Sequence, residues 1–267
     1  VDGTSAVTIN GKAYPTKHID ENKLYVYLPA GNYTVANGNS QKIYTIADDG
    51  TVSEVGTAFT ITGTDLVYGT DYTYPADTGV LTILSDKAIT IANADGVYEA
   101  DDHINVAKNI NADITLAGVN ISASDNAAFA IADNSTGDVT LTLADGSVNV
   151  LKSGARCAGL QKNGADDSVG TLTICGTGSL SAQGGISGAG IGGGNACDGS
   201  NIEISGGTVT ATGGKSGAGI GGGYNRSADN IKISGGEVTA TGGKGGAGIG
   251  GGYPRGSADN IKICGGS

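Results

Sequence analysis

The sequence predicts an all-β fold: a parallel β-helix with three strands and about 30 residues per coil, preceded by a small antiparallel β module. Three observations predict it. Near-identical segments begin at Asn201, Asn230 and Asn260, which sets a period of 29 or 30 residues. Short runs inside each segment alternate between apolar and polar residues, as strands do and helices do not. Glycine-rich turns separate these runs.

One repeat contains three such runs. In the segment that begins at Asn201, the apolar residues of the three runs are Ile202 and Ile204, Val209 and Ala211, and Ala218 and Ile220. Glycines fall between the runs, where the chain turns with positive φ angles. Three strands joined by three corners make one coil of a β-helix. A single coil cannot bury its own apolar face, so the coils must stack on one another.

Residues 81–267 are predicted to form six coils and the start of a seventh. The pairs expected to face the core in the first four coils are Leu81/Ile83, Ile89/Ile91 and Ile104/Val106; Ile114/Leu116, Val119/Ile121 and Phe129/Ile131; Leu141/Leu143, Val148/Val150 and Ala158/Leu160; and Leu172/Ile174, Leu180/Ala182 and Ala189/Ile191. The two best repeats are the fifth and sixth coils. Ile261/Ile263 opens a seventh, and the sequence ends within that repeat. We therefore expect a piece of a longer, processed protein.

The first 80 residues are of a different kind. Residues 1–57 carry strand-like runs at 6–9, 23–28, 33–35, 43–46 and 51–55, with a hairpin signal at Asp49-Gly50, and are expected to form a small sandwich-like antiparallel module. Residues 58–80 are expected to be a connector and cap. Its residues Tyr68, Tyr72 and Tyr74 would cover the first coil, because an open solenoid end exposes apolar core and unpaired backbone.

Composition narrows the range of partners. The chain has 267 residues, 49 of them glycine, and a net charge of −11. An acidic chain without a basic stripe argues against nucleic acid and anionic membranes as partners. No apolar run approaches the roughly 18 residues of a membrane helix, so we expect no membrane insertion. We expect a monomer. The four cysteines fall on different edges or several coils apart, which predicts free thiols.

Stacked coils turn each repeat position into a column of side chains. The clearest column is Asn201, Asn230 and Asn260, which we interpret as a structural ladder of hydrogen-bonded side chains. Asp229 and Asp259 stand directly before it and are candidate ligands for a calcium ion, a cation that prefers oxygen ligands. The repeats lack the acidic nonapeptide of calcium-binding β-rolls. Apart from this calcium candidate, no cofactor is expected.

A second column combines aromatic and basic residues. Tyr224 and Tyr253 each follow three glycines, and Arg226 and Arg255 lie two residues further on. Flat aromatic faces beside guanidinium groups suit sugar rings, so these four residues are the candidate ligand-binding site. The alternative is that the tyrosines only cover a corner of the core. A third column, Gly159, Gly190, Gly219 and Gly248, is expected to leave bare backbone that another segment approaches closely.

Support for catalysis is weak. The two histidines lie in different regions, and no nucleophile, zinc-protease or phosphate-binding motif occurs. The acids of a polysaccharide lyase or hydrolase would have to come from Asp101, Asp102, Asp166 and Asp167. These are loop doublets, which are more often solvated turns than acid/base pairs.

The repeats resemble a known kind of protein. The Gly-Ala-Gly-Ile-Gly-Gly-Gly runs, with Asn-Ile-Lys-Ile-Ser-Gly-Gly and Val-Thr-Ala-Thr-Gly-Gly, are similar to glycine-rich right-handed parallel β-helix segments of large bacterial cell-surface proteins. The resemblance covers roughly residues 58–267. Some similar proteins are described as carbohydrate-binding, and the resemblance supplies no catalytic motif.

This resemblance sets the functional expectation. We expect a non-enzymatic, extracellular module of the bacterial cell surface that binds a polysaccharide or a cell-surface glycan, or that acts in adhesion. The alternatives are a β-helix polysaccharide lyase or glycoside hydrolase, and a structural stalk or spacer.

Overall fold

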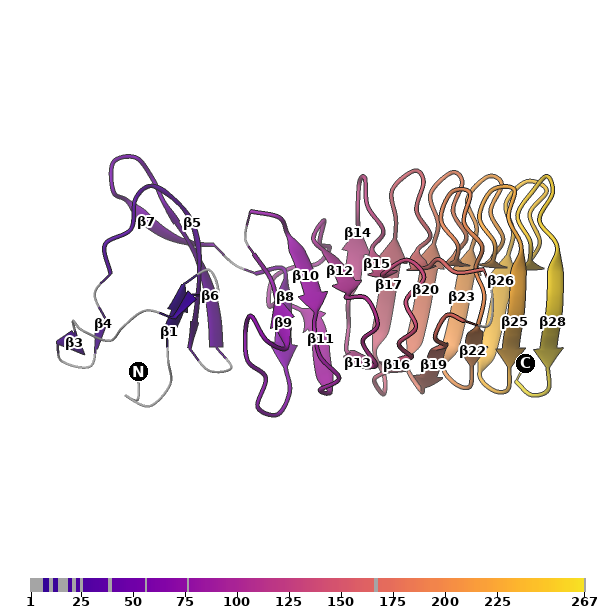
Figure 1. Cartoon of the computed structure of the whole chain (residues 1–267), viewed down its shortest axis with the longest axis horizontal. Coiled ribbons are helices and arrows are strands. Elements are labelled where there is room, and N and C mark those ends of the chain that lie inside the picture. The colour runs from indigo at the N-terminus through magenta and orange to yellow at the C-terminus, as the bar shows by residue number, and fades with distance from the viewer. Residues whose placement is uncertain are drawn as a thin grey trace.

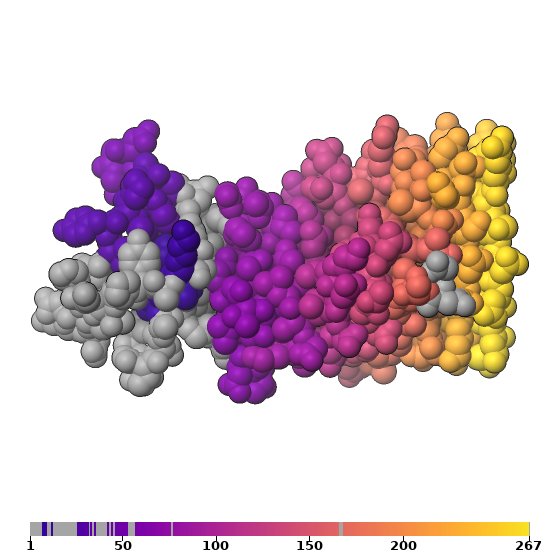
Figure 2. Space-filling model, in the orientation of Figure 1, coloured from indigo at the N-terminus to yellow at the C-terminus, as the bar shows by residue number. Residues whose placement is uncertain are grey.

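The computed structural model describes residues 7–9, 12–13, 19–20, 23–24, 26–37, 40–55, 57–75, 77–165 and 168–266. Within these residues every regular element is a β-strand. The repeat region forms a rod of stacked coils (Figure 1). Successive coils follow one another as bands of colour along the surface of the rod (Figure 2). The predicted all-β fold with a parallel β-helix is therefore confirmed.

The N-terminal region is antiparallel, as predicted. Its main sheet has the order β2-β1-β5-β6-β7, and β3 pairs with β4 in a separate two-stranded sheet. The bounds are β1 Val7–Ile9, β2 Lys12–Ala13, β3 Ile19–Asp20, β4 Lys23–Leu24, β5 Gly31–Asn37, β6 Ser40–Ile46 and β7 Val52–Val55. The predicted strand at 23–28 is too long: β4 ends at Leu24, and residues 26–28 are irregular.

Three sheets form the sides of the rod, and their strands are parallel except for β8 and β9 at the N-terminal end. The first-strand sheet has the order β28-β25-β22-β19-β16-β13-β11-β8, the second-strand sheet β14-β17-β20-β23-β26, and the third-strand sheet β27-β24-β21-β18-β15-β12-β10-β9. Equivalent positions of the repeats pair directly, for example Ile202 with Ile231 and Val209 with Val238. The period read from the sequence is therefore the register of the sheets.

The strand bounds follow the repeats. The first-strand sheet contains β8 Phe59–Thr62, β11 Ile89–Asn93, β13 Ala112–Leu116, β16 Val139–Leu143, β19 Leu172–Gly176, β22 Ile202–Ile204, β25 Ala228–Ile233 and β28 Ala258–Ile263. The second-strand sheet contains β14 Asn120–Ser122, β17 Val148–Lys152, β20 Ser179–Gln183, β23 Thr208–Thr212 and β26 Glu237–Thr241. The third-strand sheet contains β9 Tyr72–Thr73, β10 Val80–Ile83, β12 His103–Val106, β15 Phe129–Ile131, β18 Leu160–Lys162, β21 Ile191–Gly192, β24 Ile220–Gly221 and β27 Ile249–Gly250.

The N-terminal end of the rod is closed by antiparallel strands. β8 pairs antiparallel with β11, and β9 pairs antiparallel with β10. Tyr68, Tyr72 and Tyr74 are buried here, and the Tyr74 ring stacks on Phe59 with centroids 5.6 Å apart. The cap covers the apolar interior of the first coil, which an uncapped solenoid end would expose to solvent.

The predicted phase of the first coil is wrong. Leu81 pairs with Ile104, so Leu81/Ile83 belongs to the third-strand sheet rather than opening the first coil. Ile89 pairs with Ile114, which makes β11 the first strand of that coil. The side between β11 and β12 is represented only by an isolated bridge from Ala100 to Ile121. This coil has no regular second strand, so the sequence-based prediction placed Leu81/Ile83 and Ile89/Ile91 one side of the rod away from their true sheets.

The third coil contains a second correction. The sequence predicts that Val148 and Val150 face the core, but Val148 is 67% exposed, whereas Asn149 and Leu151 are fully buried. The Asn149 side chain accepts hydrogen bonds from the backbone N–H groups of Gly118 and Val119, at 3.0 and 2.9 Å. Its amide donates to Ser147 Oγ and to the Ser179 carbonyl. A fully satisfied asparagine can therefore take an inward position that the apolar pattern assigned to valine.

The outward glycine column meets the chain's own backbone. A β-carbon on Gly190 would lie 2.6 Å from the Thr212 nitrogen, and one on Gly219 would lie 2.7 Å from the Thr241 nitrogen. The close approach expected for this column is therefore made by the end of the second strand of the following coil. The four cysteines Cys157, Cys175, Cys197 and Cys264 are free thiols.

Candidate functional site

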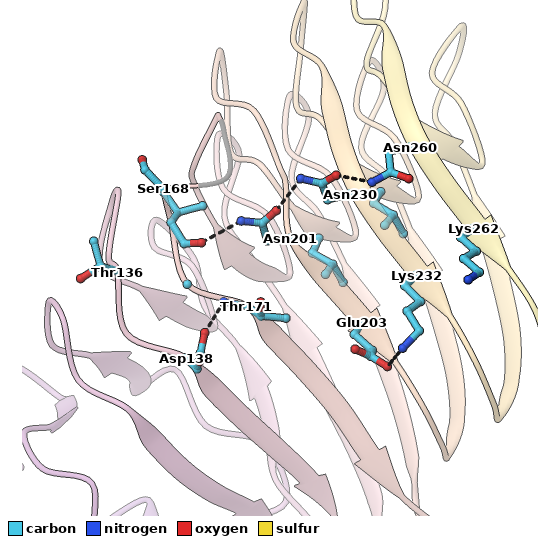
Figure 3. A pocket seen from close by; sticks show the side chains of 14 residues that line it. Thr136, Asp138, Ser168, Thr171, Asn201, Glu203, Asn230, Lys232, Asn260 and Lys262 are labelled. Atoms are coloured by element: carbon cyan, nitrogen blue, oxygen red, sulfur yellow. Dashed lines mark hydrogen bonds and ion pairs between the residues drawn. The ribbon is translucent and has the colours of Figure 1, made fainter.

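An open groove of about 560 Å³ runs along the first-strand sheet (Figure 3). It crosses the starts of five successive strands, β16, β19, β22, β25 and β28, and so extends about 19 Å along the rod at a spacing of roughly 4.8 Å per strand. Its polar lining residues are Thr136, Asp138, Ser168, Thr171, Asn201, Glu203, Asn230, Lys232, Asn260 and Lys262.

The asparagine column forms one wall of the groove. Asn201 Nδ2 donates to the Val169 carbonyl at 2.7 Å, Asn230 Nδ2 to Asn201 Oδ1 at 3.0 Å, and Asn260 Nδ2 to Asn230 Oδ1 at 2.5 Å (Figure 3). All three residues have left-handed backbones, with φ of 54°, 55° and 51°. Asparagine tolerates this conformation better than other residues with a β-carbon. The column is thus a chain of side-chain hydrogen bonds from coil to coil.

The same column continues upstream with different residue types. Thr171 and Asp138 precede β19 and β16 just as Asn201 precedes β22, and the Thr171 N–H donates to Asp138 Oδ1 at 2.7 Å. The Asp138 N–H in turn donates to Asn111 Oδ1 at 3.0 Å. Reading the sequence for identical residues missed these members. The signal that identifies them is their position directly before the first strand of each coil.

Charged side chains form the floor of the groove. Lys232 Nζ contacts Glu203 Oε1 at 2.6 Å across one coil, and Ser234 Oγ donates to the same oxygen at 3.2 Å. The hydrogen bond from Lys232 lowers the pKa of Glu203, and the carboxylate raises the pKa of Lys232. Lys262 pairs in register with Lys232 one coil further on. The floor therefore presents an ion pair followed by a further ammonium group.

Asp229 and Asp259 lie in register on β25 and β28. The Asp259 N–H donates to Asp229 Oδ1 at 3.1 Å, so one of the two candidate carboxylates already accepts a backbone hydrogen bond. Within the described ranges, no group of three or more His, Cys, Asp or Glu side chains is placed to hold a metal ion. The calcium site therefore stays a prediction. Its two candidate ligands, Asp229 and Asp259, lie in register on adjacent strands.

The tyrosine and arginine column lies apart from the groove lining. Tyr224 and Tyr253 are 41% and 53% exposed, and both arginines are exposed. Arg226 is 3.8 Å from Asp198, a long contact between an exposed guanidinium group and a half-buried carboxylate. In the part of the chain that the structure describes, ring-to-ring contacts occur only in the N-terminal cap, so the two tyrosines do not stack on each other. The four residues stay a predicted binding edge with accessible rings.

The structure describes two of the four candidate catalytic acids, Asp101 and Asp102. Asp101 accepts hydrogen bonds from the N–H and hydroxyl of Ser124, and Asp102 accepts one from the Tyr74 hydroxyl of the cap. Burial lowers the pKa of His103 beside them. Asp166 and Asp167 lie outside the described residues. Asp101 and Asp102 therefore serve as hydrogen-bond acceptors in the fold, and neither lines the groove.

Comparison with known proteins gives one match. The family model for the beta helix repeat matches residues 202–224 and 231–253, which make up most of the fifth and sixth coils. No curated protein and no solved structure gives a significant match to the chain. The chain is therefore similar to β-helix repeat proteins in its best-preserved coils. Among the described residues, no helix is long and apolar enough to span a membrane.

Proposed function

We propose that this chain is a non-enzymatic module of the bacterial cell surface that binds an extended polysaccharide along the groove of the first-strand sheet. The observation that carries the proposal is the shape of that groove. It is open, it runs parallel to the rod axis, and it repeats similar polar groups from one coil to the next. A linear polymer of similar units can meet such a surface unit by unit.

The chemistry of the lining supports a sugar ligand. Asparagine carboxamides and threonine and serine hydroxyls both donate and accept hydrogen bonds, as sugar hydroxyls do. The side chains of Glu203 and Lys232 fix the position of two charges within this polar wall. Because the ladder and the ion pair are formed within the protein itself, the site is preorganised, and binding would require little additional ordering of side chains.

The ion pair favours binding over catalysis. Efficient general acids and bases have pKa values near the working pH. Mutual hydrogen bonding moves the pKa of Glu203 down and that of Lys232 up, so both side chains stay charged at neutral pH. Neither group is then well suited to give or take a proton. A lyase or hydrolase remains the alternative, and a structural spacer is the further one.

The proposal is tested by blocking the groove. Soluble neutral and acidic polysaccharides are titrated into the protein and into the Glu203→Trp variant, whose indole would fill the groove, with folding checked by circular dichroism. The matched control is Thr210→Trp, an exposed outward position on β23 of the neighbouring sheet. We expect Glu203→Trp to weaken glycan binding about tenfold or more, as loss of a central contact does, and Thr210→Trp to leave it unchanged.

Two results would contradict the proposal. If no polysaccharide binds, or if both tryptophan variants bind equally well, the groove is not a glycan site. Incubation with the bound polysaccharide, followed by assays for new reducing ends and unsaturated products, separates binding from cleavage. New products would favour the lyase or hydrolase.

A further inference from the structure

Basic residues are concentrated in the C-terminal half of this acidic protein. Residues 140–267 contain nine of the 15 lysines and arginines but only eight of the 26 aspartates and glutamates. Six of the basic and aromatic residues of this half lie in the glycine-rich loops of the fifth and sixth coils. We call this set the loop face; it consists of Lys215, Tyr224, Arg226, Lys244, Tyr253 and Arg255.

Backbone hydrogen bonds bring the two kinds of loop together. One kind, at 213–217 and 242–246, precedes the third strand, and the other, at 222–227 and 251–257, follows it. The third strands β24 and β27 between them have only two residues each. The Tyr224 N–H donates to the Ser187 carbonyl at 2.8 Å, and the Tyr253 N–H donates to the Ser216 carbonyl at 2.9 Å. Each tyrosine loop is thus joined to a loop of the other kind on the preceding coil.

The two lysines of the loop face are stacked on adjacent coils. A β-carbon on Gly243 would lie 1.7 Å from the Gly214 carbonyl oxygen and 2.7 Å from the carbonyl carbon of Lys215. Lys215 and Lys244 follow these two glycines and are both exposed. Like charges held on adjacent coils repel one another. Within the described residues, the structure records no ion pair for either lysine or for Arg255. An anion placed here would relieve this repulsion.

The aromatic part of the loop face is fixed by a glycine. A β-carbon on Gly245 would lie 2.7 Å from two atoms of the Tyr253 ring, so the ring rests in space that any larger residue would fill. The equivalent residue one coil earlier is Ser216. More than half of Tyr253 stays exposed while its ring is held in place. An exposed ring that is already ordered is a good platform for the flat face of a sugar.

We propose that the loop face is a second binding site, which takes an acidic polysaccharide. Lys215, Lys244 and Arg255 would meet its carboxylate or sulfate groups, and the two tyrosines would pack against its sugar rings. Single-stranded nucleic acid is also anionic and can stack on tyrosine rings, so it is the competing ligand that the test includes. The inference does not depend on whether the groove binds a glycan, since the two sites share no residue.

The test measures binding of polygalacturonate, heparin, neutral dextran and single-stranded DNA to the whole chain at low and raised salt. The variants are the pair Lys215→Gln with Lys244→Gln and the pair Tyr224→Ala with Tyr253→Ala. The matched control is Lys12→Gln with Lys108→Gln, which removes the same charge from two other exposed lysines. Comparing polygalacturonate with heparin separates carboxylate from sulfate recognition.

We expect at least one acidic polysaccharide to bind, and each loop-face pair to weaken that binding about tenfold or more. We expect binding to fall with added salt, the control pair to stay within about twofold of the parent, and dextran binding to be unaffected by the loop-face variants. The inference is overturned if the control pair weakens binding as much as the lysine pair, or if DNA binds as tightly as the acidic glycans. It also fails if Glu203→Trp alone abolishes acidic-glycan binding, although the groove proposal would then stand.

Discussion

The side-chain amide of Asn230 donates a hydrogen bond of 3.0 Å to the side-chain oxygen of Asn201, one coil away, while both backbones are left-handed. Asn230 thus links the groove wall across two coils and also tolerates a backbone conformation that is unfavourable for most residues. The wall depends on both properties, and substitution separates them.

Asn230→Ala is expected to lower the free energy of unfolding by about 1–3 kcal/mol, because it removes the ladder hydrogen bonds and places alanine at a positive φ. Asn230→Gly removes the same hydrogen bonds without the backbone penalty and should cost less. Urea unfolding curves measure both. Equal stability of the parent and the alanine variant would show that the ladder contributes nothing to the fold.

The buried Asn149 makes a second prediction. Asn149→Leu would match Leu180, its neighbour in register, but would leave the N–H groups of Gly118 and Val119 without their acceptor. We expect a loss of about 2–4 kcal/mol in unfolding free energy. The control is Val148→Ala, which changes the exposed neighbour and should stay within about 0.5 kcal/mol of the parent. The opposite order would mean that Val148, not Asn149, faces the core.

The column of glycines on the third strands predicts different costs of substitution at Gly190 and Gly248. Gly190→Ala places a β-carbon 2.6 Å from the Thr212 nitrogen and 2.7 Å from the Gly219 oxygen, so the backbone of the next coil must move. Such overpacking typically costs about 1–3 kcal/mol. Gly248→Ala, in the last complete coil, meets only the Ala240 oxygen within 3.4 Å and should cost less. Thermal unfolding of the two variants checks the order, and a more damaging Gly248→Ala would contradict it.

The ion pair of the groove predicts a measurable titration. Lys232→Gln removes the hydrogen bond that lowers the pKa of Glu203, so this pKa should rise toward its ordinary value of 4.5. A carboxyl group whose pKa is lowered by folding stabilises the folded protein at pH values above its ordinary pKa. This contribution is lost as the pH falls through the pKa of the folded state. The parent should lose its advantage over the variant in that acidic range. Carbon-13 NMR of the Glu203 carboxyl reports the shift, and an unchanged pKa would rule out the pairing.

The repeats determine how much of this could be predicted. In the fifth coil the alternating pairs match β22 and β23 residue for residue, because the neighbouring copy carries the same pattern in the same register. The phase failed at Leu81, where a strand is absent and an antiparallel cap supplies the partner. It failed at Val148 because the apolar residues Val148 and Val150 alternate with the polar Asn149, which favours burying the two valines. The hydrogen bonds of Asn149 to other coils decide instead that Asn149 and Leu151 are buried.

The candidate site was predictable in part for a similar reason. Asn201, Asn230 and Asn260 repeat the same residue type, and their column is visible in the sequence. Thr171 and Asp138 occupy the same position with other chemistry, so identity alone could not reveal them. The groove itself depends on outward side chains and loop shapes from five coils, which no single repeat encodes.

Lys162 is a lysine buried in the core, a position that its charge does not predict. It is 4% exposed, it pairs in register with the core residue Ile131, and its ammonium donates to the Ser200 carbonyl at 2.8 Å. Burial lowers its pKa to about 8, against a smaller opposing effect of the Asp138 carboxylate. The unfolded chain therefore holds this proton more tightly than the folded protein does, so folding stability should rise as pH increases from about 8 toward the ordinary value of 10.5.

Lys162→Met should abolish that rise and stabilise the protein at pH 7 by up to a few kcal/mol, since each unit of pKa is worth about 1.4 kcal/mol. Urea unfolding of the parent and the variant at pH 7 and pH 10, with the exposed Lys152→Met as control, measures the difference. If Lys162→Met is destabilising by the same amount at both pH values, the lysine acts through its hydrogen bond to Ser200 and its buried charge does not govern stability.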